Sequence, residues 1–368
     1  MSSATGQAQQ RIAQLLTELT ASGNDLGVQV AVYQRGELVV DAWAGSMDVP
    51  GGRQVDGDTL FPVFSTGKGV AATAVHVLAQ RGVLSYDAPL AHCWPEFAVH
   101  GKGGITLRHA LNHTAGLPDM PPCQHMTDVC DWDLMCRRVA ALLPLWPAGE
   151  QMRYHAITFS WLVGEPARRI DGRPFARIVD EEIARPLGLE RDLFFGITDD
   201  LRHRIATLQP LKNPALPAVE DPAIPHIVRP LEDLMNQPAV QRACIPASNA
   251  IASARAIARH YAALLDGGVD GVQLLTPDTL RAATTLTQPG GVPLEQLSAR
   301  RGLGYNLSGP DHAVASVFGH GGYGGSTGYA DARRRLAVGV TKNVMDAPRS
   351  VVEEVKAILA GLGDLPGR

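Results

Sequence analysis

The chain has few cysteines, no long apolar run and no apolar segment among its first residues. Each of these absences argues against a class of protein. Five cysteines in 368 residues are a sparse, odd-numbered set, which argues against a disulfide framework and favours a reducing compartment. No stretch reaches the roughly 18 uninterrupted apolar residues of a membrane-spanning helix. The first ten residues contain no apolar segment of the kind that secretion signals carry. We therefore expect a cytoplasmic protein without a membrane partner.

Charge of one sign is not in excess either. Lys and Arg total 33 against 37 Asp and Glu, for a net charge of −4, and no basic run stands out, so the electrostatic footprint of a nucleic-acid-binding protein is absent. Hydrophobic residues make up 45% and charged residues 19%, which is typical of a globular chain rather than a disordered or fibrous one. Small molecules or neutral polymers remain as the expected partners.

Apolar periodicity predicts strands at both ends of the chain and helices between them. Gln9 to Ala21 carries a helical stripe, and Gly27 to Ala44 is predicted to form a hairpin. Further strands are predicted over residues 304–307, 313–318, 328–331 and 336–341, followed by a helix over 350–362. The clearest helical segments between the ends are 70–80, 106–112, 134–143, 159–170, 175–183 and 254–265.

This order of elements indicates an α/β (α+β) fold. The simplest assembly joins both chain ends in one antiparallel sheet with flanking helices and inserts an all-α lobe between them. We predict that residues 1–59 and 250–368 form the α/β lobe and that residues 60–249 form the helical lobe. Residues 209–247 hold eight prolines, too many for regular elements, and we expect an ordered loop there.

Ser65 and Lys68 are the first pair that carries chemistry. Ser65 precedes a strongly apolar helix and Lys68 follows one turn later, so the two side chains share a face. A serine hydroxyl is a weak nucleophile until a base removes its proton, and a lysine in a dry site can do so. Chance alone gives about 0.2 Ser-x-x-Lys matches in a chain with 14 serines and 5 lysines. The alternative is an N-cap serine and a solvated lysine.

Two later segments supply groups that suit a Ser-Lys acyl-transfer enzyme. Tyr154 follows a Pro-Gly turn and precedes a predicted helix, where it can point into a cleft. His320-Gly321-Gly322 ends a predicted strand, and the glycines there allow a substrate carbonyl to approach a backbone N–H.

The three motifs, in this order, resemble those of the serine β-lactamase and penicillin-binding-protein superfamily. The likeness is to its class C-like branch, which includes family VIII carboxylesterases, D-aminopeptidases and statin-type acyltransferases. Ser65-Thr66-Gly67-Lys68 is similar to the first motif, Tyr154-His155-Ala156 to the Tyr-x-Asn second motif, and His320-Gly321-Gly322 to the Lys/His/Trp-x-Gly third motif. Residues 105–117 and 252–259 are also similar to the branch, and the resemblance covers roughly residues 10–360. It implies a β-lactamase-like fold with the active site between the two lobes and no cofactor.

The resemblance also implies a role for each matching residue. Ser65 would be the acylated nucleophile, with Lys68 and Tyr154 as general base and acid in an order left open. The backbone N–H groups of Ser65 and Tyr323 would form the oxyanion hole. His320 would orient the tyrosine proton or bind a substrate carboxylate. The predicted substrate-binding residues are His155, His320, Gly321 and Gly322. The alternatives are a hydrogen-bonded strand histidine for His320 and a packed aromatic for Tyr154.

The sequence departs from the family pattern at Ala156, where an asparagine often binds the amide of a β-lactam or peptide. Losing that side chain matters least for simple esters. We therefore predict a carboxylesterase (EC 3.1.1) that forms an acyl-enzyme, with acyl transfer as a possible extension. The alternatives are a β-lactamase, a D-amino-acid amidase or peptidase, and a weakly active structural or ligand-sensing protein.

Three other patterns compete with this interpretation. Gly324-Gly325-Ser326-Thr327-Gly328 fits the nucleophile elbow of α/β-hydrolases, but that motif needs a following helix and a strand is predicted instead. His109 and His113 lack the Glu of a His-Glu-x-x-His zinc motif. A second candidate metal cluster fits no Cys-x-x-Cys pair and is better explained as buried thiols in a loop and a helix; it comprises Cys123, His125, Cys130 and Cys136. No metal site is predicted.

Overall fold

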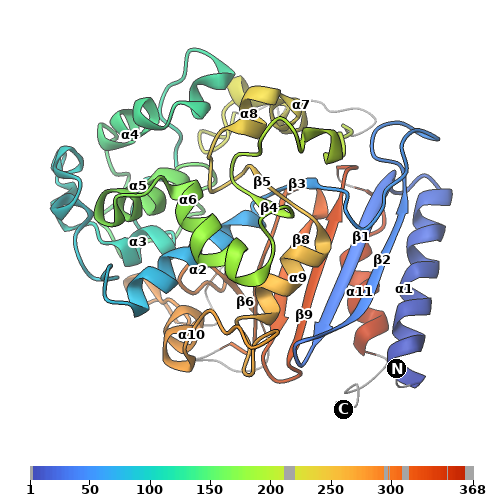
Figure 1. Ribbon diagram of the computed structural model, residues 1–368. Helices are drawn as coiled ribbons and strands as arrows, with labels where there is room; N and C mark the ends of the chain where they lie inside the picture. The colour runs from blue at the N-terminus through green and yellow to red at the C-terminus, as the bar shows by residue number, and fades with distance from the viewer. Residues whose placement is uncertain are drawn as a thin grey trace.

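The two ends of the chain form one antiparallel sheet (Figure 1). The computed structural model describes residues 3–210, 220–293, 297, 299–308, 315–345 and 347–360. The strand order is β2-β1-β9-β8-β7-β6, and β1 pairs with β9 with Val30 opposite Val340. The strands are β1 (Gly27–Gln34), β2 (Glu37–Gly45), β6 (Asn306–Ser308), β7 (Val317–Gly321), β8 (Thr327–Asp331) and β9 (Leu336–Lys342). The predicted hairpin and sheet are confirmed, although residues 313 and 314 of one predicted strand lie outside the described residues.

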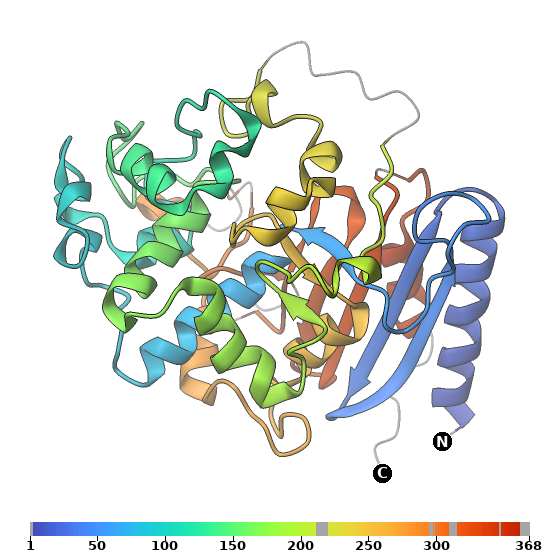
Figure 2. The same ribbon diagram turned by 45° about the horizontal axis from the view of Figure 1, so that its top comes forward.

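Alternate residues of the central strands face two different apolar cores, as the two-residue period of a strand requires. Val28 and Val30 of β1 pack with α1 (Ser3–Ala21) and α11 (Val351–Ala360), and Figures 1 and 2 show both helices on the outer face of the sheet. Ala31 and Tyr33 belong to the second core, with α9 (Ala254–Ala262). Residues 361 and 362 of the predicted terminal helix lie outside the described residues.

The middle of the chain is mainly helical and gathers on the side of the sheet opposite α1 (Figure 2). The predicted helical segments are confirmed with shifted ends, and within the described part of the chain no helix is long and apolar enough to cross a membrane. The division into two domains stays a prediction. The remaining α-helices are α2 (Gly67–Gln80), α3 (Leu107–Leu111), α4 (Trp132–Ala140), α5 (Phe159–Asp171), α6 (Phe175–Val179), α7 (Leu231–Asn236), α8 (Pro238–Arg242) and α10 (Pro277–Thr284).

The prediction of no regular structure in residues 209–247 is wrong for its second half. The segment contains α7 and α8, while residues 211–219 lie outside the described residues. Pro230 immediately precedes α7 and Pro238 is the first residue of α8. Proline is tolerated at the start of a helix because the first N–H groups have no intrahelical acceptor.

A second, three-stranded sheet has no counterpart in the sequence-based prediction. It consists of β3 (Phe61–Phe64), β5 (Ala250–Ala252) and β4 (Leu193–Phe194) in the order β3-β5-β4. Strands of two to four residues are too short to show an apolar period. This sheet matters for the site because β3 leads directly into Ser65.

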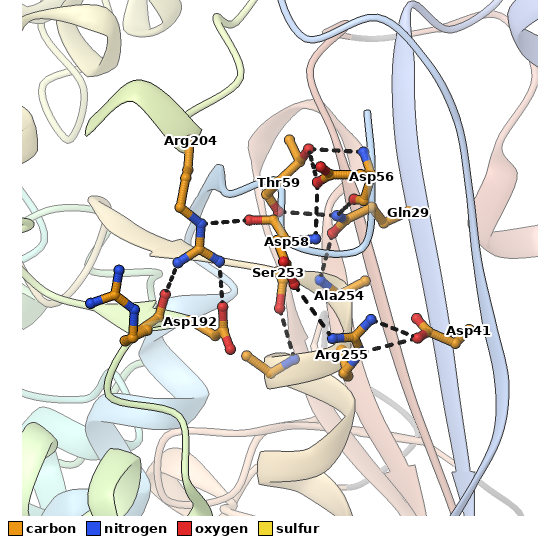
Figure 3. Close-up of polar contacts among 12 residues, drawn as sticks. Gln29, Asp41, Asp56, Asp58, Thr59, Asp192, Arg204, Ser253, Ala254 and Arg255 are labelled. Carbon is orange, nitrogen blue, oxygen red and sulfur yellow. Dashed lines mark hydrogen bonds and ion pairs between the residues drawn. The ribbon is translucent and has the colours of Figure 1, made fainter. Parts of the chain in front are cut away.

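Gln29 of β1 ties the large sheet to the loop that precedes β3 (Figure 3). Its Nε2 donates to the carbonyls of Asp56, at 2.6 Å, and Thr59, at 3.0 Å. Its Oε1 accepts from the N–H of Ala254 at 3.0 Å and the hydroxyl of Thr341 at 3.1 Å. Since Gln29 is only 3% exposed, this network holds β1, β9, α9 and the start of β3 in one arrangement.

Candidate active site

Ser65 lies in a tight turn between β3 and α2. The preceding residue, Phe64, is buried and has φ = 49°, a left-handed conformation that costs a bulky residue about 1–2 kcal/mol. Such strain persists only where the surrounding structure enforces it, and it is common at functional sites. The turn presents Ser65 to a pocket that Phe64 also lines.

Lys68 is fully buried and makes three polar contacts. Its Nζ lies 3.0 Å from the Oγ of Ser65 and 2.7 Å from each of the carbonyl oxygens of Ala156 and Ala247. Carbonyl oxygens only accept, so two N–H bonds of the amine point at them. Burial, and next the charge of Arg301, lower the pKa of Lys68 well below its usual value. The lowered pKa and the short distance to Ser65 Oγ make this amine a candidate base for the Ser65 hydroxyl.

Tyr154 lies over the same amine. The centroid of its ring is 4.8 Å from Lys68 Nζ. Burial raises the pKa of Tyr154 to about 12, against the opposing effects of a hydrogen bond with Ser65 and the charge of Arg301. The phenol is therefore protonated at neutral pH and is a candidate proton donor beside the Lys68 amine.

The glycine-rich segment after β7 packs against the nucleophile turn. A Cβ on Gly322 would lie 2.3 Å from the carbonyl oxygen of Val63, and the rings of Phe64 and Tyr323 meet edge to face at 5.6 Å. The N–H of Gly322 donates to the carbonyl of Ser326 at 2.7 Å. Gly321 lines the pocket and Gly322 does not. The lack of a side chain at Gly322 lets two backbones approach, and its role in binding substrate stays a prediction.

His320 lines the pocket as a neutral hydrogen-bond acceptor. It is 5% exposed, and burial, with the Lys68 charge second, lowers its pKa to about 3. Its Nδ1 donates to the Gly321 carbonyl at 2.7 Å, while its Nε2 has no partner among the described residues. The two predicted roles of His320, orienting the tyrosine proton or binding a substrate carboxylate, stay predictions.

His155 lies outside the pocket lining, and its role as a substrate-binding residue stays a prediction. The side chain is fully buried and absent from the pocket lining. Its Nε2 accepts from the N–H of Leu117 at 3.1 Å, and its Nδ1 donates to the carbonyl of Arg153 at 2.7 Å. Both ring nitrogens are thus used to join two backbone segments.

The pocket has a volume of about 350 Å³, enough for a small organic molecule. Its apolar lining comes from the segments before α4 and α5 and from the proline-rich region. These residues are Val129, Ile157, Ile224, Leu231, Leu234, Met235 and Ile245. Its polar lining is formed by Ser65, Tyr154, Ser248, Arg301, Asn306 and His320.

Arg301 is a pocket residue that sequence reasoning missed. Its Cζ lies 4.8 Å from the centroid of the Tyr154 ring, and its Nη1 donates to Asn306 Oδ1 at 2.6 Å. In the sequence it follows another arginine in a polar stretch, a pattern that usually indicates a solvated surface. Only the folded chain brings it to Tyr154.

The competing motifs do not form sites. Ser326 is 2% exposed, its Oγ accepts from the N–H of Lys342 at 3.3 Å, and a strand follows it. Nδ1 of His109 accepts from the N–H of Thr106 at the start of α3, and Nδ1 of His113 accepts from the N–H of His155. Within the described ranges, no three His, Cys, Asp or Glu side chains are grouped to hold a metal ion.

Comparisons with known proteins agree with this geometry. The family model described as beta-lactamase matches residues 12–362. The Esterase/beta-lactamase LipL of Mycobacterium tuberculosis is 32% identical over 339 residues, which are 88% of this chain and 78% of that protein. A family VIII carboxylesterase structure superposes with a TM-score of 0.85 at 29% identity, covering 98% of each chain. A penicillin-binding protein homolog from Caulobacter crescentus gives 0.84 at 33% identity, covering 99% of this chain and 98% of that one.

Proposed function

This chain belongs to the beta-lactamase family, and from that premise we propose that it hydrolyses carboxylic esters through an acyl-enzyme on Ser65. At the level of the family it is a serine hydrolase of the β-lactamase and penicillin-binding-protein superfamily, with relatives named esterase and carboxylesterase. The observation that carries the finer proposal is the 3.0 Å contact between Lys68 Nζ and Ser65 Oγ. A buried amine already bonded to two carbonyls is suited to take the serine proton.

Acylation then follows from the positions of the three groups. Lys68 takes the proton of Ser65 as Oγ attacks the ester carbonyl, and the oxyanion is stabilised by the N–H groups of Ser65 and Tyr323. Tyr154 gives its proton to the departing alcohol as the carbon–oxygen bond breaks. The proton that Lys68 holds returns to Tyr154, which leaves an ester between Ser65 and the acyl group.

Deacylation is the same sequence in reverse with water in place of the alcohol. The Lys68–Tyr154 pair removes a proton from water, the hydroxide attacks the acyl carbon, and Ser65 regains its proton as it leaves. The group that this pair deprotonates is the O–H of the water. Since an alcohol offers the same donor, we include acyl transfer to an alcohol in the proposal.

A β-lactamase or D-amino-acid amidase is the second candidate function, because one relative carries both esterase and beta-lactamase in its name. Ala156 lines the pocket with a methyl group, so an amide substrate loses a hydrogen-bond partner there and an ester loses less. A merely structural role fits poorly with Ser65, Lys68 and Tyr154 in mutual contact.

The test is a comparison of the purified protein with its Ser65→Ala and Ser326→Ala variants. We expect the wild type to hydrolyse p-nitrophenyl butyrate and to be labelled by a fluorophosphonate probe. Ser65→Ala should lose both activities, and Ser326→Ala should keep both. Nitrocefin and a D-alanyl anilide should be turned over much more slowly than the ester. Loss of activity in Ser326→Ala alone, or faster turnover of nitrocefin, contradicts the proposal.

A further inference from the structure

Arg301 is a mostly buried cation in the pocket that has no anionic partner. Among the described residues it forms no ion pair, and its side-chain hydrogen bond is to the neutral amide of Asn306. The described lining of the pocket contains no Asp or Glu. Keeping a charged group away from water without a counter-charge is costly. A guanidinium has five N–H donors, and Asn306 takes one of them.

The neighbours of Arg301 place it at the leaving-group end of the site. Its guanidinium lies over the ring of Tyr154 at 4.8 Å, and Tyr154 is the residue that would protonate the departing alcohol. The ring of His320 is 6.0 Å from that of Tyr154, so the same end holds both polar side chains. The pocket lining also holds the apolar side chains of Leu231, Leu234 and Met235 from α7, which suit an acyl chain.

We propose that the substrate of this site is an ester whose alcohol portion carries a carboxylate, and that Arg301 binds that carboxylate. The inference rests on the proposed esterase function and adds the chemical class of its substrate. A carboxylate suits the site because one planar guanidinium matches one carboxylate with two parallel hydrogen bonds. No second cation is found in the described lining to balance the extra charge of a phosphate monoester.

The other basic groups nearby cannot take this role. Lys68 already contacts three oxygen atoms and is absent from the pocket lining. His320 offers no free donor, because its Nδ1 donates to the Gly321 carbonyl and its Nε2 is a buried atom. Arg301 is therefore the anion-binding group of the described pocket.

Three matched esters test the inference: 3-(butanoyloxy)benzoate, phenyl butanoate and the phenyl monoester of butanedioic acid. The first carries its carboxylate on the alcohol side, the second carries none, and the third carries it on the acyl side. We expect kcat/KM of the wild type to be at least about tenfold higher for the first ester than for the second, mainly through KM. Arg301→Gln should reduce that ratio to near one, and Arg301→Lys should retain part of it. Arg300→Gln, next in the chain and outside the pocket lining, is the control and should keep the full ratio.

A binding measurement on the Ser65→Ala variant keeps the test independent of turnover. 3-Hydroxybenzoate should bind at least about tenfold more tightly than phenol in calorimetry, and the additional Arg301→Gln change should abolish the difference. Equal turnover of the first two esters, a ratio unchanged in Arg301→Gln, or preference for the acyl-side carboxylate overturns the inference and leaves the esterase proposal intact. If the wild type neither hydrolyses the esters nor reacts with the probe, the esterase proposal is refuted. In that case the binding measurement decides on the carboxylate site, which is refuted if 3-hydroxybenzoate and phenol bind equally well.

Discussion

Lys68 holds its Nζ 3.0 Å from the Oγ of Ser65. The amine is fixed there by two carbonyls that lie far away in the sequence, those of Ala156 and Ala247. One carbonyl belongs to the Tyr154-His155-Ala156 motif, and the other belongs to the last residue of the proline-rich segment 209–247. The base is thus oriented by three separate segments, so its position depends on the whole fold and not on the helical turn alone.

From this arrangement we predict that Lys68 and Tyr154 act as one proton-transfer unit. Lys68→Met and Tyr154→Phe should each lower kcat for p-nitrophenyl butyrate by about 10³-fold or more, and the double variant should lose little beyond the worse single one. The reason is that the proton taken from Ser65 reaches the leaving alcohol only if both groups are present. Steady-state kinetics of the three variants check this.

Lys102 offers a matched control for the lysine substitution. It is also 0% exposed, and its Nζ donates to the carbonyls of Val99 and Leu142, but it is absent from the pocket lining. Lys102→Met should lower stability and keep kcat near the wild-type value. Strictly additive losses in the double variant, or a Tyr154→Phe enzyme close to wild type, would show that the two groups do not share a proton.

The large sheet and the three residues Ser65, Lys68 and Tyr154 could be predicted from the sequence. The evidence for them lies either in the spacing of neighbouring residues or in the order of the motifs along the chain. Val28, Val30 and Val338 alternate with residues that face the other core, and this two-residue period is visible in a single strand. Ser65 and Lys68 are one helical turn apart, so their contact follows from helix geometry. The sequence around Tyr154 was not enough to predict its role. That prediction depended on the position of Tyr154 between the Ser65 motif and the His320 motif.

Arg301 and α7 could not be predicted in the same way. Nothing near Arg301 in the sequence distinguishes it from an exposed arginine, because its partner Tyr154 is far away along the chain. The many prolines of this segment led to the prediction of a loop, but Pro230 immediately precedes α7 and Pro238 is the first residue of α8. The ring of His155 resembled a substrate contact by its place in a motif, but whether it faced the pocket or the backbone of Leu117 depended on tertiary packing.

We predict that α7 limits the length of the acyl chain. Leu231 lines the apolar side of the pocket and is 8% exposed, so Leu231→Trp should fill part of that space. For p-nitrophenyl hexanoate kcat/KM should fall by about tenfold or more, since each excluded methylene in an apolar pocket costs about 1 kcal/mol or more. The acetate ester should be affected about twofold or less. Leu143→Trp, on the exposed surface at 69%, is the control, and equal loss for both esters in Leu231→Trp would contradict the prediction.

Gln29 should contribute to stability without touching substrate. Gln29→Leu would leave the N–H of Ala254 and the carbonyls of Asp56 and Thr59 without their buried partner, which should lower the free energy of unfolding by about 2–4 kcal/mol. Chemical denaturation of the wild type and the variant measures the difference. Gln14→Leu is the control, because the side chain of Gln14 donates to exposed Glu18, and its effect should stay within about 0.5 kcal/mol. A stability of Gln29→Leu equal to that of the wild type would mean that the network does not hold β3 in place.

Arg301 should also set the position of the acid limb in the pH profile. The groups around the Lys68 amine include Tyr154, Arg301 and three imidazoles, those of His113, His155 and His320. Burial lowers the pKa of each imidazole, to about 3 for His155 and His320, so these stay neutral above that range. The pKa of Tyr154 is raised to about 12, so no alkaline limb is expected up to about pH 10.

The acid limb of kcat/KM for a neutral ester then belongs to Lys68, which must lose its proton to act as base. The positive charge of Arg301 disfavours the ammonium form and helps to hold the pKa of Lys68 down. Arg301→Gln removes that charge, so the ammonium form is stabilised, the pKa of Lys68 rises, and the limb should move to higher pH. Arg301→Lys should leave it close to the wild-type position, because the charge is kept. If Arg301 has only a structural role, both variants should have a lower pH-independent kcat/KM with the acid limb at its wild-type position. If the acid limb moves to lower pH in Arg301→Gln, the limb belongs to a group other than Lys68.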